Sequence, residues 1–430
     1  MARVDTPYGE EAPIAGNDAD HDWTLNRRAI TLGAGGAALA LLTGCSFTSD
    51  DDGPPEPTST PEPSPTPEVL PTPTQDVIAS PVPGYGDTSR WSGRVITIAA
   101  WGGDYQDAQR AAFFEPFAQS TGATVQEKVA DISELKTQVD DGTVLWDVLT
   151  VPMQRLVRLA TENYLTPLSY DVIDTTPLYP DIVLEFGVGA AYFSTIVTYP
   201  VASQFAPTSW ADFWGITAIP ESEDFEPSQY RSLQRSPVGT LEFALLADEV
   251  PVESLYPLDL DRAFASLDRI REHVLVWWQE SKEPIELVAA GEVGMASAFN
   301  PRIEQLELSE EIRTLWYHGM LSADAWVVPA GSQNTEMAMD FISFATRAIP
   351  TANFSRLVPF GPVNLDAFDF LRRDRVELLP SAPSNKAVQF VEDWEYWAAN
   401  FDEVSERFEA WLLETSEDAT PAARVSTGSA

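Results

Sequence analysis

The chain has 430 residues, with 66 acidic against 26 basic side chains and a formal net charge of −40 at pH 7. A surface this acidic repels nucleic acid and anionic lipid headgroups, and it attracts cations over a range set by the salt concentration. We therefore expect no nucleic-acid partner. The single cysteine excludes an intramolecular disulfide bond.

The N-terminal part predicts an export signal that ends in a lipid attachment site. Arg27 and Arg28 precede an apolar run over residues 29–42, which is shorter than the about 20 residues that a transmembrane helix needs. A double arginine before such a run is typical of the twin-arginine export route. The run ends in Leu-Thr-Gly-Cys, and this motif resembles the box at which bacterial lipoproteins are cleaved and acylated. We expect residues 1–44 to be the signal peptide and Cys45 to carry the lipid, the alternative being a free thiol in an ordinary leader.

Residues 45–90 predict a tether behind the lipid anchor. Prolines alternate with Thr, Ser and Glu over much of this segment, so it forms a semi-rigid polyproline-type spacer and no core. The folded part then extends from about residue 91 to about residue 414. These roughly 320 residues exceed what one hydrophobic core usually holds, so we expect two lobes. Residues 415–430 are expected to be a disordered tail.

Strands and helices alternate after residue 91. Strands are predicted at 94–100, 123–129 and 144–151, and helices at 106–119, from Asp131 onward, and at 153–163. The helix start at Asp131 has Glu134 three residues later, as in a capping box. This order predicts an α/β fold with a mostly parallel sheet covered by helices.

The turn after the first predicted strand contains Gly102 and Gly103, at a place where phosphate-binding loops also occur. It lacks the G-x-G-x-x-G spacing and the Lys-Ser/Thr ending, so we reject a nucleotide site. Trp101 and Tyr105 remain at the carboxyl end of that strand, the edge at which open α/β sheets bind ligands. An aromatic pair with a purely structural role is the alternative.

Seven segments spread over residues 91–413 carry a family resemblance. They are WGGDYQDAQRAAFFEPFAQSTG, PTSWADFW, RSPVGTLEFALLADEV, YPLDLDRAF, GEVGMASAFN, ADAWVVPAGSQN and FGPVN. In order and spacing they resemble the extracellular solute-binding proteins of spermidine/putrescine-type ABC importers. The resemblance implies the type II periplasmic-binding-protein fold, in which two α/β lobes enclose a ligand cleft and the chain crosses between them more than once.

The same resemblance implies where the lobes begin and end. Crossings are expected near residues 195–199, near Asp324 and near residues 364–367. Lobe I would comprise residues 91–196 plus 325–365, and lobe II residues 197–324 plus 366–414.

Proteins of this family hold a linear polyamine between aromatic rings, with carboxylates at its ammonium groups. Trp101 and Tyr105 resemble the aromatic residues after the first strand, and Phe299 stands where a Trp usually precedes Asn. Asp324 matches the ammonium-binding Asp ahead of a crossing strand, and Phe360 occupies the position of a usual Tyr.

The chain departs from the family pattern in the second lobe. Arg235 and the five residues after it replace the carboxylates expected there. If Arg235 faces the cleft, a carboxylate or a neutral tail suits the far end of the ligand better than a second ammonium, because like charges repel strongly in a dry cleft. It is equally open at this point that Asp324 only caps a turn and that Arg235 is a surface residue.

The sequence offers little for catalysis. His273 and His318 are isolated from any Ser, Cys or metal-ligand spacing, so we expect no enzyme, no metal and no cofactor. A secreted carboxylate-dependent hydrolase stays open, although no acidic pair can be singled out. An amino-acid or betaine binder of the same fold stays open too, and so does a ferric-ion binder with Tyr105 and Tyr192 as candidate iron ligands.

We therefore predict an extracytoplasmic substrate-binding protein that is lipid-anchored to the cell membrane, in the periplasm or at the cell surface. It would deliver a small amine-bearing solute to the permease subunits of an ABC transporter. Asp324 within an aromatic cage suits an organic cation better than an iron ion.

Overall fold

The structure is a computed structural model that describes residue 78, residues 81–215 and residues 229–418. The predicted signal peptide, Cys45, the greater part of the predicted tether and residues 419–430 lie outside the described residues. Among the described helices, none is long and apolar enough to cross a membrane.

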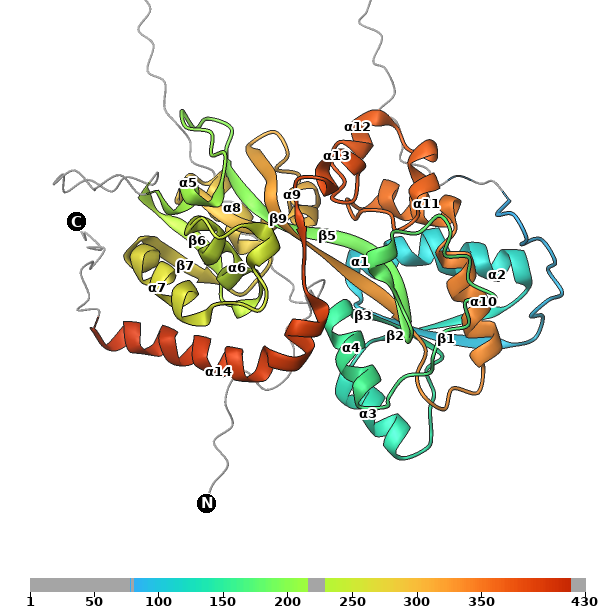
Figure 1. Cartoon of the computed structure of the whole chain (residues 1–430). Coiled ribbons are helices and arrows are strands. Elements are labelled where there is room, and N and C mark those ends of the chain that lie inside the picture. Colours follow the sequence, from blue (N-terminus) through green and yellow to red (C-terminus); the bar gives the residue numbers. More distant parts are fainter. Residues whose placement is uncertain (1–77, 79–80, 216–228, 419–430) are drawn as a thin grey trace, which may run out of the picture. The chain divides into compact units, whose positions relative to one another are not determined.

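A mixed sheet runs through the described chain in the order β2-β1-β3-β9-β5-β8-β6-β7, with β10 paired to β9 and β4 to β5 (Figure 1). The strands are β1 (Val95–Ala100), β2 (Thr124–Val129), β3 (Val148–Pro152), β4 (Val183–Leu184), β5 (Gly187–Pro200), β6 (Arg231–Gln234), β7 (Val274–Trp278), β8 (Met295–Phe299), β9 (Ile312–Val327) and β10 (Phe390–Val391). β1 is parallel to β2 and β3, and β6 is parallel to β7 and β8. Helices cover this sheet, so the predicted α/β fold is confirmed. The prediction of a mostly parallel sheet is wrong, because β5 runs antiparallel to both β8 and β9, and β9 antiparallel to β3.

Two long antiparallel strands, β5 and β9, connect the two groups of shorter strands (Figure 1). β3 pairs with the last residues of β9, and β8 pairs with the second half of β5. The β5–β9 register shifts between Thr195, opposite Met320, and Val197, opposite Leu315. Both groups of shorter strands are therefore joined through the same two neighbouring strands, β5 and β9.

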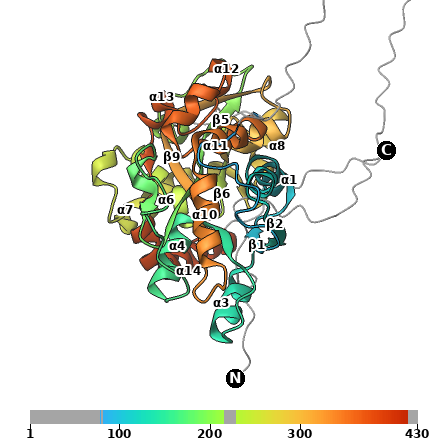
Figure 2. The ribbon, with the colours of Figure 1, turned by 90° about the vertical axis from the view of Figure 1, so that its right-hand side faces the viewer.

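The helices around β1–β3 are α1 (Gly103–Gln109), η1 (Arg110–Phe114), α2 (Glu115–Thr121), α3 (Ile132–Asp140), α4 (Met153–Thr161), α10 (Thr335–Ala345) and α11 (Ala348–Leu357). The predicted helix at 106–119 is thus part of a longer run in which η1 is a π-helix. The run ends at Gly122, whose φ of 77° is left-handed, as a glycine allows. Asp131 accepts a hydrogen bond from the Glu134 backbone N–H, which confirms the predicted helix start. Figure 2 shows α10 and α11 on this side of the molecule, near α1.

The helices around β6–β8 are α5 (Trp210–Trp214), α6 (Pro237–Ala247), α7 (Leu260–Ile270), α8 (Glu283–Ala289), α9 (Asn300–Gln305) and α14 (Trp394–Asp418). α14 extends past the predicted end of the folded part at residue 414. Short helical segments connect the larger elements: η2 (Pro180–Ile182), η4 (Val252–Ser254), η5 (Arg271–His273), η6 (Leu365–Phe370), α12 (Arg373–Val376) and α13 (Pro383–Lys386).

Two large hydrophobic cores lie on either side of the β5–β9 pair. One includes Phe113, Trp326 and Phe341, and the other includes Phe243 and Trp397, all of them almost fully buried. Separate cores are expected for a folded part of this size. They agree with two lobes, while the expected lobe boundaries stay a prediction.

The end of the predicted tether is part of the folded domain. Tyr85 donates a hydrogen bond to Asp340 on α10, Arg90 forms a 2.7 Å ion pair with it, and the Trp91 indole N–H donates to it at 2.6 Å. Val82 is buried as well, and the Ile78 backbone N–H donates to a side chain of α11. The domain therefore begins before residue 91, because Val82 and Tyr85 supply apolar contacts that the proline-rich composition concealed.

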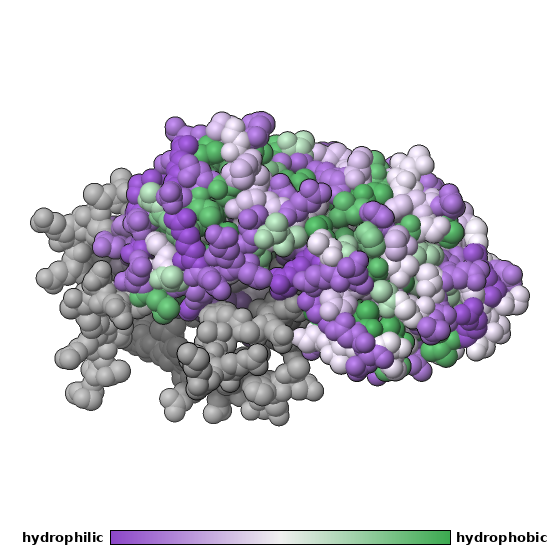
Figure 3. Space-filling view, turned by 60° about the horizontal axis from the view of Figure 1, so that its bottom comes forward, coloured by the Kyte–Doolittle hydropathy of each residue, from purple (hydrophilic) through white to green (hydrophobic). Residues whose placement is uncertain are grey.

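The surface is mainly hydrophilic. Figure 3 shows hydrophobic residues in small separate patches among hydrophilic ones on one face. Isolated exposed apolar residues are normal for globular proteins and do not indicate a docking surface.

Candidate functional site

The carboxyl ends of β3 and β8 reach the β5–β9 pair from opposite directions. Pro152, the last residue of β3, pairs with Asp324 of β9. Phe299, the last residue of β8, pairs with Thr195 of β5, which itself lies opposite Met320 of β9. Along β9, only the stretch from Met320 to Asp324, about 14 Å long, separates the end of β8 from the end of β3. Open α/β sheets bind ligands outside the carboxyl ends of their strands, so this stretch is the expected binding region.

Alternate residues of this stretch share one face of the sheet. Ser322 lies opposite Phe193 on β5, and Asp324 lies opposite Ala191. Because side chains alternate along a strand, Ser322 and Asp324 project from the same face.

Asp324 is the chemically distinctive residue of the region. Its side chain is buried, with 2% of the residue exposed, and its Oδ2 atom has no hydrogen-bond partner. Burial raises the pKa of Asp324 to about 7, although the nearby Tyr105 hydroxyl and Trp101 indole N–H lower it. Asp324 lies within β9 rather than ahead of the crossing strand, where the resemblance implied it. A buried carboxylate with a free oxygen is suited to accept a hydrogen bond from a bound cation.

Trp101 and Tyr105 are held beside Asp324 by the turn between β1 and α1. Gly102 and Gly103 have φ values of 80° and 54° in that turn, which favour glycine. The Trp101 indole N–H and the Tyr105 hydroxyl are both buried and make no close hydrogen bond within the described residues, but they lie near enough to the Asp324 carboxyl to lower its pKa as donors. Burial, followed by the charge of Asp324, raises the pKa of Tyr105. Tyr105 is therefore a neutral phenol next to the acid.

A row of aromatic rings connects this acid to the other group of strands. Ring centroids lie 4.9 Å apart for Tyr105 and Phe360, 6.2 Å for Phe360 and Phe193, 5.7 Å for Phe193 and Phe299, and 5.3 Å for Phe299 and Trp278. All four contacts are edge-on, and the five rings come from α1, the segment after α11, β5, β8 and β7. Such rings offer apolar walls to methylene groups and π faces to a cation.

Phe193 and Trp278 were missed by sequence reasoning. Phe193 is inside a long, mostly buried strand, where nothing distinguishes it from core residues, and Trp278 is the only buried residue of the strand β7. The one available signal for Trp278 is its position as the last residue of β7, because open α/β sheets bind ligands at the carboxyl ends of their strands.

Phe360 owes its position to a short bridge between the segment after α11 and β5. Gly361 and Tyr192 exchange backbone hydrogen bonds of 2.8 and 2.9 Å. Ser355 donates a 2.7 Å hydrogen bond to the Phe360 carbonyl. A side chain at Gly361 would come within 2.8 Å of the Ser381 backbone nitrogen, so only glycine fits there without a shift.

Arg235 takes a different direction from the other predicted residues. It follows β6, and its guanidinium forms an ion pair with Glu409 of α14, with 2.7 Å between Nη2 and Oε2. About 30% of its side chain is exposed. Its charge is thus balanced by Glu409, which the sequence could not show because the two residues are far apart along the chain.

A second buried acid, Glu392, lies near the same stretch of β9 and was also missed. Its Oε2 accepts a 2.6 Å hydrogen bond from Ser322, whereas its Oε1 has no partner. Burial, and then the nearby charge of Glu242, raise the pKa of Glu392 to about 8, against the opposing effect of Ser322. Among the described residues, no group of three or more His, Cys, Asp and Glu is arranged to hold a metal ion.

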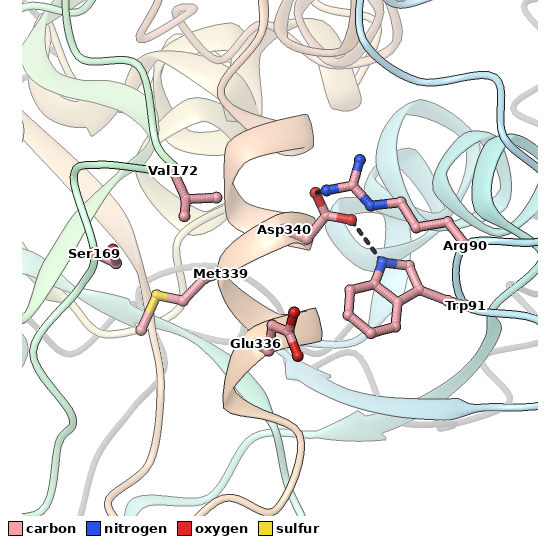
Figure 4. Close-up of a pocket in the computed structure, with 7 residues that line it drawn as sticks. All are labelled: Arg90, Trp91, Ser169, Val172, Glu336, Met339 and Asp340. Atoms are coloured by element: carbon pink, nitrogen blue, oxygen red, sulfur yellow. Dashed lines mark hydrogen bonds and ion pairs between the residues drawn. The ribbon is translucent and has the colours of Figure 1, made fainter.

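A surface pocket of about 450 Å³ lies elsewhere, against α10 (Figure 4). Its wall includes Asp340, whose carboxylate is already occupied by Arg90 and Trp91. Glu336 also lines this pocket, but its carboxylate is exposed to solvent, which weakens its attraction for a cation relative to the buried Asp324.

Comparison with known proteins agrees with this architecture. The family model described as bacterial extracellular solute-binding protein matches residues 112–387. A gamma-aminobutyric acid-binding protein of Pseudomonas aeruginosa is 33% identical over 328 residues, covering 74% of this chain and 90% of that protein.

Solved structures show the same likeness. The Atu4243-GABA receptor superposes with a TM-score of 0.68 at 32% identity, covering 77% of this chain and 100% of the receptor chain. The spermidine/putrescine-binding protein PotD of Streptococcus pneumoniae has a TM-score of 0.60 at 18% identity, covering 74% of this chain and 99% of its own, so this likeness concerns the fold alone. Homologues of this kind are solute-binding proteins of ABC transporters and not enzymes. The chain belongs to the family of bacterial extracellular solute-binding proteins.

Proposed function

We propose that the chain binds a small amine-bearing solute of the γ-aminobutyrate type, with the ligand ammonium on Asp324, and delivers it to an ABC permease. The observation that carries this proposal is the unpartnered Oδ2 of the buried Asp324, which has the equally unpartnered Tyr105 hydroxyl beside it. An ammonium satisfies both, because it donates to the carboxylate and to the phenol oxygen.

The aromatic row supports an aliphatic amine rather than a metal ion. Tyr105, Phe360 and Phe299 would line the methylenes, and a cation over such a ring gains about 0.5 to 2 kcal/mol. The names of two similar proteins, which refer to γ-aminobutyrate, point to the same ligand class.

The ligand carboxylate needs a cation at the far end. Arg302 lies in α9, directly after Phe299, and Arg155 lies in the first turn of α4, directly after β3. We place the ligand carboxylate at this end of the site because these two arginines follow strands that end at the site, whereas the Arg235 guanidinium is directed to Glu409. A diamine such as putrescine is the second candidate, because a balanced Arg235 does not repel a second ammonium.

A thermal-shift panel on residues 75–418 tests the ligand class. The panel contains γ-aminobutyrate, putrescine, spermidine, glycine betaine and ferric ion. A true ligand at about 100 times its Kd stabilises the folded state by about 2.7 kcal/mol, which gives a clear shift in Tm. We expect the γ-aminobutyrate sample to shift. A shift with betaine or iron alone would overturn the proposal.

We further propose that Cys45 anchors the exported protein to the membrane, as the lipobox-like Leu-Thr-Gly-Cys motif predicts. Cys45→Ala should abolish metabolic labelling with palmitate while the domain still folds. Unchanged labelling would remove Cys45 from this role.

A further inference from the structure

We propose that Glu392 and Ser322 form a second polar subsite, next to Asp324, that receives a hydrogen-bond donor of the ligand, either a hydroxyl or an amine N–H. This inference rests on the proposed function, because it takes Asp324 to hold the ammonium. It adds that the solute carries a second donor a few bonds from its ammonium.

The first support is an unsatisfied oxygen. Glu392 is 3% exposed, and its Oε2 is occupied by the Ser322 hydroxyl at 2.6 Å, while its Oε1 is buried without a partner. A buried acceptor without a donor destabilises the folded state. A ligand donor that reaches Oε1 would recover this free energy on binding.

The second support is the position of Glu392 beside β9. Its backbone N–H donates to the Leu321 carbonyl at 3.0 Å, directly after β10 pairs with Met320 and Leu321. β3 pairs with β9 at the other end of this stretch, from Asp324 onward. Glu392 is therefore bonded to Ser322, two residues from Asp324 and on the same face, about 7 Å along the strand.

The third support comes from the polar atoms around it. Thr195, which pairs with Met320 and Phe299, also has a buried hydroxyl without a partner. Unpartnered polar atoms thus occur at both ends of the stretch, at Asp324 and Tyr105 on one side and at Glu392 and Thr195 on the other. A ligand with two polar groups would satisfy both ends.

A nearby acid shows what a structural glutamate looks like in this fold. Glu242 is equally buried, yet its Oε1 accepts hydrogen bonds from Tyr256 at 2.6 Å and from Trp397 at 2.7 Å, and its Oε2 accepts one from the Gly239 N–H at 2.9 Å. Both of its oxygens are satisfied by the protein. Glu392 lacks such a set of hydrogen-bond donors, so its Oε1 can accept a hydrogen bond from a ligand.

The test compares ligands that differ by one donor. 4-Amino-3-hydroxybutyrate adds a hydroxyl to γ-aminobutyrate, and putrescine replaces the carboxylate by a second amine. Calorimetry at pH 9, where Glu392 is ionised and its Oε1 can only accept, gives the affinity of each for the unaltered domain and for Glu392→Gln, in which an amide NH₂ at the Oε1 position cannot accept. We expect 4-amino-3-hydroxybutyrate, which keeps the carboxylate, to bind at least tenfold more tightly than γ-aminobutyrate, and this preference to fall about tenfold in Glu392→Gln. Putrescine, which lacks the carboxylate, shows whether a second amine can take the place of the hydroxyl.

Asp147→Asn is the control, because it alters a buried carboxylate whose oxygens are bonded only by protein groups, from Thr97, Ser332 and Asn334. Glu242→Gln is unsuitable as a control, because the charge of Glu242 acts on Glu392. Asp147→Asn should leave the ratio of affinities unchanged. If Glu392→Gln does not fold, Ser322→Ala takes its place, and it should lower the same ratio.

Two outcomes separate this inference from the proposed function. If Asp324→Asn abolishes binding of every amine while Glu392→Gln or Ser322→Ala leaves the ratio unchanged, the second subsite is wrong and the proposed function stands. If no amine binds the unaltered domain, the proposed function fails first.

Discussion

The buried carboxyl group of Asp324 destabilises the folded protein without ligand and, in the proposed site, stabilises the complex with an amine. A carboxyl group in a dry site disfavours its charged form, which is why burial raises its pKa to about 7. An ammonium removes this cost by pairing with the charge. Residues of this kind are typical of binding sites, because stability alone would not select an unpartnered buried acid.

Affinity for an amine should therefore depend on pH. Below pH 7 a proton occupies Asp324, and the ammonium must displace it, so affinity should fall about tenfold per pH unit below 7 and level off above 7. Calorimetry at pH 5.5, 6.5, 7.5 and 8.5 checks this, with proton release measured in two buffers of different ionisation enthalpy. Affinity that stays constant from pH 5.5 to 8.5 would contradict the assignment of Asp324.

The stability of the empty protein should change in the opposite direction. The pKa of Asp324 is raised in the folded state, from 3.8 to about 7, so the folded state holds its proton more tightly than the unfolded chain does. This stabilising effect is present below the unfolded pKa and is lost as the pH rises toward 7.

Asp324→Asn removes the titration. It should raise the Tm of the empty domain by about 2 °C or more at pH 8 and change it little near pH 4. Thermal unfolding of both proteins at the two pH values provides the measurement. A lower Tm of the Asn variant at pH 8 would show that the charge of Asp324 is balanced in the empty protein.

At the residue level, sequence patterns pointed to most residues of the proposed site but not to its balance of charges. Trp101 and Tyr105 were accessible because they follow a recognisable strand, and the resemblance supplied Phe299, Asp324 and Phe360. The Arg235–Glu409 ion pair and the Ser322–Glu392 hydrogen bond join residues far apart in the chain. Such pairings depend on how the elements pack, which local patterns do not contain.

At the level of elements, the backbone bridge at Gly361 holds Phe360 against Tyr105. An alanine there would press on the Ser381 backbone, which cannot move aside as a flexible side chain can. Gly361→Ala should lower stability by about 1 to 3 kcal/mol and weaken ligand binding, because Phe360 would shift. Urea unfolding and calorimetry measure the two effects.

Gly86→Ala is the control for this substitution, since nothing lies within 4 Å of the added Cβ. It should leave both properties unchanged. Equal behaviour of the two variants would mean that the bridge does not position Phe360.

Helices and strands were predictable where the spacing of apolar residues within a short segment was clear. The order β1-α1-β2-α3-β3-α4 followed from apolar spacing and caps. The length of β5 and β9 did not, because a strand buried on both faces has no alternation and its extent depends on its neighbours. The π-helix η1 also has no signature in the sequence.

For the whole molecule, the β5–β9 pair joins two cores around the proposed binding stretch from Met320 to Asp324. Few connections between two cores allow hinge motion, and a ligand that contacts both sides favours the closed arrangement. We expect small-angle scattering of the domain to give a smaller radius of gyration with saturating ligand than without it. An identical radius at saturation would contradict closure.

The proposed function depends most on the pairing of the ligand ammonium with Asp324. Its most direct test is calorimetric titration of γ-aminobutyrate, 4-amino-3-hydroxybutyrate and putrescine at pH 8 into the unaltered domain and into Asp324→Asn. A charge-assisted hydrogen bond contributes roughly 1.5 to 3 kcal/mol, so the substitution should weaken binding of the true ligand about 10- to 100-fold. Equal affinity in the two proteins would contradict the role of Asp324.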